Sequence, residues 1–356
     1  MGKDMIRLGD VATYINGYAF KPEDRGEVGL PIIRIQDLTG NSYDLGFYNG
    51  EYPRKIEIDN GDILISWSAS LGVYVWNRGK ALLNQHIFKV AFDKVDIDKN
   101  YFVYAVRHKL DDMERKTHGA TMKHIVKKDF DATLIPYPSL SKQVEIATTL
   151  DKLSKIIKVR QQELQLMDDL IRARFVEMFG DPIKNPKGWE VVTIGDIATE
   201  VKYGTSKPAV EGGKYPYLRM NNLTSDGHLD LNDLKYIDIP NDEIEKCVVR
   251  KGDVLFNRTN SIELVGKTAV FDLPDDMVIA GYIIRVRLNE KILPEVLSQY
   301  MNLEALKDIL RSMAKGAVNQ ANINAQELQS IKVYIPDMGL QKTFIEIKDQ
   351  VDKSKV

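Results

Sequence analysis

The stretch IRLGDVAT at residues 6–13 decides the fold, because it recurs nearly residue for residue as VTIGDIAT at residues 192–199. A long internal period of this kind indicates a duplicated structural unit. Further pairs follow in the same order along the chain: PIIRIQDLT at 31–39 with PYLRMNNLT at 216–224, GDILI at 61–65 with GDVLF at 252–256, Gly-Ala at 119–120 and again at 316–317, and PSLSKQ at 138–143 with PDMGLQ at 336–341.

The composition is that of a folded, soluble protein, with 44% hydrophobic and 28% charged residues among 356. This length suits two domains of about 150 residues plus connecting elements. The net charge of -2 argues neither for nor against a polyanionic partner. No signal peptide and no membrane-length apolar run is found, so we expect a cytoplasmic protein. The single cysteine, Cys247, excludes an internal disulfide framework and a zinc site built on cysteine pairs, and we expect it to be buried.

Each copy is predicted to mix α and β structure, which gives an α+β fold class with two duplicated α/β domains. Short segments rich in Ile, Val and aromatic residues, bounded by Gly, Asn or Asp, predict strands at 31–38, 61–66, 71–76 and 87–92. Helical spacing of apolar residues predicts a helix over 101–113 and its counterpart over 296–313. We therefore expect domains at residues 1–140 and 181–338, separated by a helix at 141–180 and followed by a short helix at 339–356.

The segment between the copies is predicted to be a coiled-coil helix. Residues 141–178 contain no Gly and no Pro, and at about 1.5 Å per residue they would form a rod roughly 57 Å long. Arg160 and Arg174 fill two positions of the apolar seam. The second copy offers a partner at 340–356, but it is less than half as long, so either the chain is truncated or part of the long helix pairs with another subunit. The other seam residues are Ile146, Leu150, Leu153, Ile157, Leu164, Met167, Ile171 and Met178 in the long helix, with Phe344, Ile347 and Val351 in the short one.

This ordered pattern resembles the DNA-specificity subunit of type I restriction-modification systems. Each unit opens on a Leu-Gly-Asp-Val-Ala type segment and closes on a strand ending at Pro138 or Pro336 that runs into a Gln-containing helix. The resemblance covers essentially the whole chain, although the second helix is shorter than the family pattern. It implies that each unit is a target-recognition domain for one half of a split double-stranded DNA sequence. A rod of about 57 Å is also long enough to separate half-sites that recur every 34 to 36 Å or so.

The resemblance also implies partners for this chain. The seam residues would dock two methyltransferase subunits, and restriction subunits would join them. The chain itself would be non-catalytic, with no metal and no cofactor. S-adenosylmethionine, ATP and Mg are expected on the partner subunits, which would methylate adenines flipped out of the duplex.

Two sets of residues are candidates for DNA contact. The first set follows the basic stretch 107–128 and the Gly-Ala loops, where Lys and Arg suit phosphates and Asn and Gln suit adenine. The alternative for this set is a solvated helix face and loop. The second set lies in the loops after the Gly-Asp strands, which occupy equivalent places yet differ in sequence, as readers of different half-sites would. The alternative is an ordinary hairpin loop with Trp67 in the core. The first set is Lys116, His118, Thr121, Lys123, His124, Lys127, Lys315, Asn319 and Gln320, and the second is Ser66, Ser68, Ser70, Asn257, Arg258, Thr259 and Asn260.

Two further pairs of positions were open to more than one interpretation. Thr205 and Lys207 follow a Gly-containing turn and are also candidates for DNA contact. Arg34 and Arg219 occupy matching positions, where a phosphate contact and a structural salt bridge are both compatible with the sequence.

Catalytic signals are poor. The stretch Val-Gly-Lys-Thr at 265–268 lacks the earlier glycine of a phosphate-binding loop. Asp337, Glu346 and Lys348 imitate a nuclease pattern, but residues two apart on a helix point away from each other. The five histidines show no metal-ligand spacing. A Mg-dependent nuclease and a DNA-independent protein scaffold remain the alternative functions.

Overall fold

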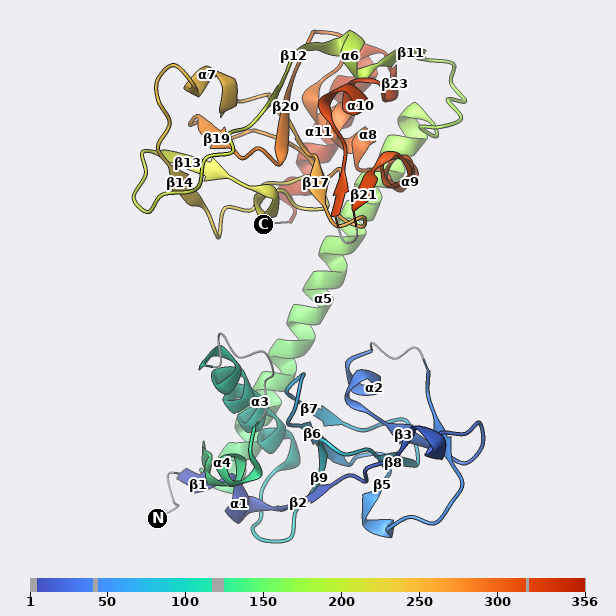
Figure 1. Ribbon diagram of the computed structural model, residues 1–356, viewed down its shortest axis with the longest axis vertical. Helices are drawn as coiled ribbons and strands as arrows, with labels where there is room; N and C mark the ends of the chain where they lie inside the picture. Colours follow the sequence, from blue (N-terminus) through green and yellow to red (C-terminus); the bar gives the residue numbers. More distant parts are fainter. Residues whose placement is uncertain (1–4, 41–43, 117–124, 318–319, 356) are drawn as a thin grey trace. The chain divides into compact units, whose positions relative to one another are not determined.

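The computed structural model describes residues 5–40, 44–116, 125–317 and 320–355, with side chains omitted at 113–116, 315–317 and 320. The chain divides into two compact units, unit 1 at residues 1–158 and unit 2 at residues 159–356 (Figure 1). No described helix combines the length and apolar character that a membrane crossing needs.

Unit 1 contains two four-stranded sheets and a short strand pair. The first sheet has the order β2-β9-β6-β7 and is antiparallel. The second has the order β4-β3-β8-β5, with β3 parallel to β8. The pair β1-β10 joins the two ends of the unit. The strands are β1 (Met5–Arg7), β2 (Thr13–Asn16), β3 (Leu30–Ile33), β4 (Phe47–Tyr48), β5 (Glu57–Ile58), β6 (Ile63–Ser66), β7 (Gly72–Val75), β8 (Ala81–Leu83), β9 (Ile87–Ala91) and β10 (Leu134–Pro136); the helices are α1 (Leu8–Val11), α2 (Ile35–Thr39), α3 (Lys99–Lys116) and α4 (Lys127–Ala132).

Unit 2 repeats this topology. Its sheets have the orders β12-β20-β16-β18 and β14-β13-β19-β15, its strand pair is β11-β23, and a three-stranded sheet β17-β22-β21 is added. The strands are β11 (Glu190–Thr193), β12 (Ala198–Tyr203), β13 (Tyr215–Leu218), β14 (Lys235–Ile237), β15 (Val248–Val249), β16 (Val254–Asn257), β17 (Thr259–Asn260), β18 (Thr268–Val270), β19 (Met277–Ile279), β20 (Ile283–Leu288), β21 (Lys315–Ala317), β22 (Gln320–Asn322) and β23 (Lys332–Ile335); the helices are α6 (Ile194–Ile197), α7 (Ile244–Cys247), α8 (Pro294–Met301), α9 (Glu304–Met313), α10 (Ala325–Gln329) and α11 (Met338–Lys353).

The repeated Gly-Asp pairs have a physical reason. Gly61 and Gly252 adopt φ values of 89° and 92°, which a residue with a Cβ adopts only with strain. In unit 1 the Gly61 N–H donates to Trp76 O, directly after β7, which pairs with β6. In unit 2 the Gly252 N–H donates to Phe271 O, directly after β18, which pairs with β16; both distances are 2.8 Å. The turn thereby fixes the register of the buried central strand in both copies.

Two predicted elements were wrong in extent. The strand expected over 31–38 ends at Ile33, because Asp37 accepts a hydrogen bond from the Arg34 N–H at 2.8 Å and so starts α2. The helix expected over 296–313 is broken into α8 and α9. The break lies at Asn302 and Leu303: Leu303 adopts an extended backbone (φ -68°, ψ 142°), and the Asn302 side chain donates to Thr268 O at 2.6 Å.

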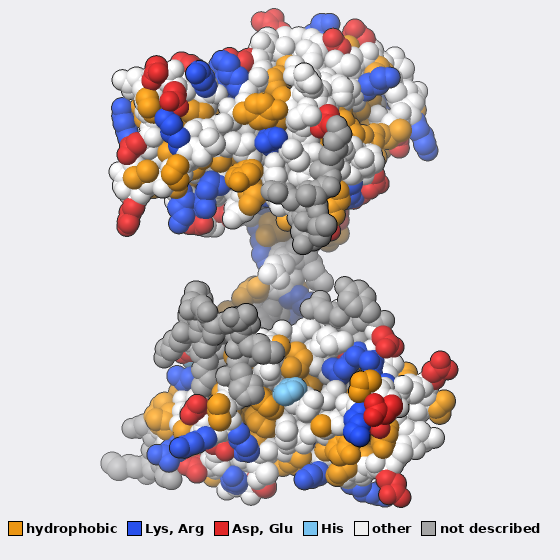
Figure 2. Space-filling model, viewed as in Figure 1, with side chains coloured by type: hydrophobic (Ala, Val, Ile, Leu, Met, Phe, Trp, Pro, Cys, Tyr) orange, Lys and Arg blue, Asp and Glu red, His pale blue; other side chains and the backbone are white. Residues whose placement is uncertain are grey.

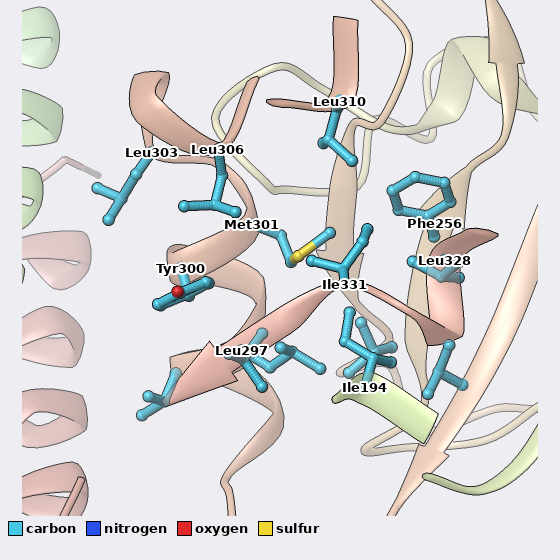
Figure 3. Close-up of a cluster of buried hydrophobic side chains, with 14 of the residues drawn as sticks. Ile194, Phe256, Leu297, Tyr300, Met301, Leu303, Leu306, Leu310, Leu328 and Ile331 are labelled. Carbon is cyan, nitrogen blue, oxygen red and sulfur yellow. The ribbon is translucent and has the colours of Figure 1, made fainter. Parts of the chain in front are cut away.

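Aliphatic and aromatic side chains from α5 (Leu140–Phe179), α6, α8, α9, α10 and α11 and from strands β16, β20 and β23 form the main core of unit 2 (Figure 3). In that view the side chains of Met301 and Ile331 lie between the helix that carries Tyr300 and the side chain of Phe256, and Leu328 lies next to Phe256. Leu297, Met301, Leu306 and Leu310 repeat at helical spacing and are almost completely buried, which positions α8 and α9 against the sheet. Cys247 is buried as predicted.

Helix α5 (Leu140–Phe179) is one continuous helix of 40 residues. In unit 1 its first turns bury Gln143 and Ala147. In unit 2 its last turns bury Phe175 and Phe179, whose rings lie 5.3 and 5.5 Å from the ring of Phe344 in α11. The helix ends at Gly180, which adopts a φ of 91° and donates to Val176 O at 2.8 Å.

Part of the predicted seam requires correction. Phe175 occupies the buried position, because the apolar spacing after Ile171 is four rather than three, and Arg174 faces solvent to pair with Glu177 at 2.6 Å. Ile171 and Phe344 are buried inside unit 2, so they cannot offer the partner-subunit contact expected of them. Leu153 and Ile157 are 49% and 57% exposed and remain candidates for such a contact. The other candidates, Ile146, Leu150, Leu164, Met167 and Val351, are half-buried.

Candidate nucleic-acid interface

The two loops after the Gly-Asp strands share one backbone arrangement. In unit 1, the Trp67 N–H donates to His86 O at 3.3 Å and Trp67 O accepts from the Ile125 N–H at 3.0 Å. In unit 2, the Arg258 N–H donates to Tyr282 O and Arg258 O accepts from the Ile323 N–H, both at 2.9 Å. Trp67 and Arg258 are therefore structurally equivalent, and they carry entirely different side chains on the same scaffold.

In unit 2 this scaffold borders a hollow of about 590 Å³. Thr205, Lys207 and Arg258, which the sequence placed in separate segments, meet there. Backbone contacts of Thr205 hold the rim, because Thr205 forms a parallel bridge with Ala280 and the Gly281 N–H donates to Thr205 O at 2.7 Å. The lining residues are Thr205, Ser206, Lys207, Pro208, Ala209, Tyr217, Arg219, Met220, Asn221, Arg258, Ala280, Gly281 and Tyr282.

Three cationic side chains line this hollow; two of them form ion pairs and the third stacks on an aromatic ring. Lys207 Nζ lies 2.9 Å from Glu243, and Arg219 Nη2 lies 2.7 Å from Asp233. Hydrogen bonds from Arg219 and Lys235 hold the pKa of Asp233 below its usual range. The Arg258 guanidinium instead lies over the ring of Tyr203, 4.9 Å from its centroid. Tyr282 is 50% exposed, which adds an aromatic surface at the rim.

The equivalent surface of unit 1 is aromatic. Trp67 stacks on Phe88 with ring centroids 5.6 Å apart and meets the His86 ring edge-on at 4.9 Å. Trp67 therefore packs against the core, as the alternative interpretation of this loop required. Tyr18 corresponds to Thr205, because it forms the equivalent bridge with Asn84, and it is 43% exposed.

Several candidate side chains are turned inward, which corrects the expectation that they face DNA. Ser66 is buried, and its hydroxyl donates to Ser70 O at 2.5 Å. Asn257 is fully buried at the end of β16. Thr259 is 6% exposed and its hydroxyl donates to Asn322 Oδ1 at 3.1 Å. These positions support the loops, whereas Ser68, Ser70 and Asn260 keep exposed surface.

The Gly-Ala loops largely lie outside the described part of the structure. His118, Thr121, Lys123, His124 and Asn319 fall there, as do the side chains of Lys116, Lys315 and Gln320. Lys127 is described, and its ammonium group pairs with Asp131 at 2.8 Å on the surface of α4. On the faces visible in Figure 2, basic and acidic side chains are interspersed over both units.

Arg34 and Arg219 share a structural role that was one of the two predicted alternatives. Arg34 Nε lies 3.2 Å from Asp37, and Arg219 Nη2 lies 2.7 Å from Asp233. Each guanidinium also donates to a backbone carbonyl of the loop that follows, Asp44 O in unit 1 and Asp233 O in unit 2. The sequence could indicate these pairs only through the matching positions of the two arginines.

The described residues give little support to catalysis. Asp337 caps α11 by accepting from the Gly339 N–H at 2.8 Å, Lys348 pairs with Asp352, and Glu346 is exposed, so the nuclease-like trio is dispersed. Within the described ranges, Asp168, Asp226 and His228 form the single group with metal-ligand geometry. Lys355 lies 2.6 Å from Asp168, and its positive charge does not fit a cation site.

Comparisons with known proteins agree with the duplicated fold. A family model described as the type I restriction modification DNA specificity domain matches residues 2–166 and again 186–356. The EcoBI specificity subunit of Escherichia coli is 24% identical over 379 residues, covering 97% of this chain and 78% of that protein. The EcoKI specificity subunit of E. coli K12 is 23% identical over 377 residues, covering 96% and 80%. The S subunit structure from M. genitalium aligns with a TM-score of 0.53 at 16% identity over 99% of this chain and 89% of that one.

The chain has a duplicated mixed α/β unit, and the two copies carry different side chains on equivalent surfaces. Together with the family match, this defines a two-domain DNA-specificity protein. The chain belongs to the type I restriction-modification DNA specificity family, in which it is a non-catalytic specificity subunit that recognises the DNA target within the complex. The predictions of family, fold class, DNA recognition and a non-enzymatic role are thereby confirmed.

Proposed function

We propose that the chain reads a bipartite DNA sequence, with one half-site assigned to each unit. The observation that carries this proposal is the pair of equivalent positions Trp67 and Arg258, which have the same backbone hydrogen bonds and different side chains. Sequence readout requires side chains that differ with the bases, on a backbone that keeps its position. The hollow beside Arg258 and the surface beside Trp67 are accordingly the two proposed recognition sites.

The proposed partners are double-stranded DNA, two modification subunits and the restriction subunits of the complete complex. The exposed apolar side chains of α5 support a docking role, since Leu153, Ile156, Ile157 and Leu166 are between 49% and 67% exposed. We assign S-adenosylmethionine, ATP and Mg to those partners, and we propose that the complex is cytoplasmic. This chain contributes recognition, which is consistent with the dispersed nuclease-like trio.

The test is an exchange of units. Residues 8–138 are replaced by the matching segment of a relative with a different target, the complex is reassembled, and the methylated motif is read by sequencing. One half of the motif should change and the other should persist. The matched control exchanges residues 194–336, which should change the opposite half. If either exchange altered both halves together, the units would not be independent readers. Loss of DNA binding by the intact complex would favour the protein-scaffold alternative.

A further inference from the structure

Arg258 differs from the other cations of its hollow in having no described acidic partner. Lys207 and Arg219 each form an ion pair, whereas no carboxylate among the described residues lies within ion-pair distance of Arg258. Its Nη1 reaches Gly281 O at 3.5 Å, and its Nε is buried without a partner. A guanidinium carries five N–H donors in a planar fork, so most of the donors of Arg258 are available to a ligand.

The position of this guanidinium is fixed in advance. The backbone of Arg258 is held on both sides, by Tyr282 O and by the Ile323 N–H. The Tyr203 ring beneath it is held in turn, because the Tyr203 hydroxyl accepts a hydrogen bond from the Ala325 N–H at 2.8 Å. An arginine that is stacked before binding loses less conformational freedom when it forms a bidentate contact.

The comparison between the units separates reading from positioning. Phosphates are chemically identical in both half-sites, so a residue that only positions the backbone should recur in both copies. At this position unit 1 has Trp67, which packs on Phe88 and offers no such fork. The hollow is also nearly neutralised by its two ion pairs and is bordered by Met220 and Tyr282, which suits a planar base better than a phosphate track.

We propose that Arg258 donates two hydrogen bonds to O6 and N7 of a guanine in the half-site that unit 2 contacts. Arginine with guanine is the pairing that this fork geometry favours in the major groove. This inference rests on the proposed bipartite recognition, and it names one base of the target and the side chain that reads it. Unit 1 has no arginine at the equivalent position, so the contact is specific to the half-site of unit 2.

The experiment uses the assembled complex and duplexes that carry its methylated motif. Each guanine is replaced in turn by 7-deazaguanine, which lacks the N7 acceptor, and the affinities of wild type, Arg258→Met and Arg258→Lys are measured. At one guanine of the unit 2 half-site the analogue should weaken wild type by about 5- to 150-fold. The same analogue should leave the affinity of Arg258→Met unchanged, and the four affinities form a double-mutant cycle between the residue and the base. Arg258→Lys, which keeps the charge but not the fork, should lose most of the guanine preference.

Lys251→Met is the matched control, because Lys251 is an exposed cation of unit 2 outside the hollow, and it should retain the response of wild type. The response of the wild-type complex to the analogue can be measured without any variant. If Arg258→Met misfolded, the analogue series on wild type and the Arg258→Lys measurement would still test the guanine contact. Equal weakening on all sequences, with a salt slope reduced by about 0.9, would assign Arg258 to a phosphate and overturn the inference. A bipartite motif in which no guanine responds would overturn it while leaving the proposed function intact. A complex without a bipartite preference would overturn both.

Discussion

Unit 1 and unit 2 agree where a residue supports the backbone and differ where a side chain faces solvent. Gln143 and Gln341 are both fully buried. The side-chain oxygen of Gln143 accepts from the N–H of Asp98, the residue before α3, and that of Gln341 accepts from the N–H of Leu293, the residue before α8, both at 2.9 Å. Each also donates to the carbonyl of the preceding proline, at 2.8 and 2.9 Å. Trp67 and Arg258 share equivalent backbone hydrogen bonds but carry unlike side chains. Recurrence between the copies therefore identifies fold, and divergence on a recurring backbone identifies specificity.

The largest expected effect comes from lengthening α5, which lies between the two copies in the sequence. An insertion of four helix-forming residues after Ile157 adds about 6 Å. Affinity for the native target should fall toward non-specific binding, by about 10³-fold or more. The complex should instead methylate a motif with the same two half-sites and a changed spacer, which sequencing of methylated DNA would detect. A changed half-site would mean that the units do not read DNA independently of the helix.

The second effect concerns the two ends of α5, which are packed differently. Unit 2 buries the aromatic contact of Phe175 with Phe344, whereas unit 1 buries the smaller Ala147. Phe175→Ala should lower the free energy of unfolding of unit 2 by about 3 to 5 kcal/mol, because a buried ring leaves a cavity. Urea unfolding followed separately for each unit would measure this. Leu166→Ala on the same helix, at a side chain 67% exposed, should stay within about 0.5 kcal/mol of wild type.

Much of this architecture was predictable from spacing in the sequence. The interval without Gly or Pro predicted a helix over residues 141–178, and α5 spans Leu140–Phe179, since such a segment has no internal breaker. The break between α8 and α9 was not predictable, because apolar residues continue at helical spacing on both sides of it. The extended backbone of Leu303 and the bond from the Asn302 side chain to Thr268 O are tertiary features that no local pattern indicates.

The candidate site was predictable in outline but not in detail. Equivalent loops with different sequences indicated where the copies diverge, and Arg258 was among the residues selected. The stack of Arg258 on Tyr203 joins segments far apart in the chain, so no local pattern could indicate it. The inward orientation of Asn257 and Thr259 was missed for a similar reason: polar residues suggest exposure, whereas Asn257 ends a strand that is buried along its whole length and Thr259 contacts Asn322.

The third effect is a pH dependence of stability that we expect from Lys307 in unit 2 and not from Lys109 in unit 1. Burial and the nearby charge of Arg311 lower the pKa of Lys307 to about 7, whereas its unfolded value is about 10.4. Between these values the unfolded chain binds a proton that the folded chain does not, so stability should rise with pH across this window. The slope is at most about 1.4 kcal/mol per pH unit. Below pH 7 or so the folded chain also binds the proton, and this contribution to the slope disappears.

Lys307→Met should make this pH-dependent rise shallower, leaving the contribution of Lys267, whose pKa burial also lowers, and thermal unfolding between pH 6.5 and 9.5 or so would measure the difference from wild type. Lys109 in α3 of unit 1 supplies the control, since it is not fully buried and lies 3.9 Å from Asp112. Lys109→Met should retain the slope of wild type. Parallel slopes for wild type and Lys307→Met would show that Lys307 keeps its proton in the folded unit through its bonds to Gly266 O and Asn302 Oδ1.

The smallest effect concerns Arg34 and Arg219, which occupy matching positions in the two copies. Each holds a carboxylate of its own unit, and the side chains are 17% and 28% exposed, so their ion pairs are only partly screened. Arg34→Met and Arg219→Met should each destabilise their own unit by about 1 kcal/mol, because a charged hydrogen bond is lost. Affinity for DNA measured well below the unfolding temperature should keep its salt slope. A slope reduced by about 0.9 in either variant would instead identify a phosphate contact. In that case, the recurrence of an arginine at this position in both copies would reflect a shared contact with the DNA backbone as well as a role in the fold.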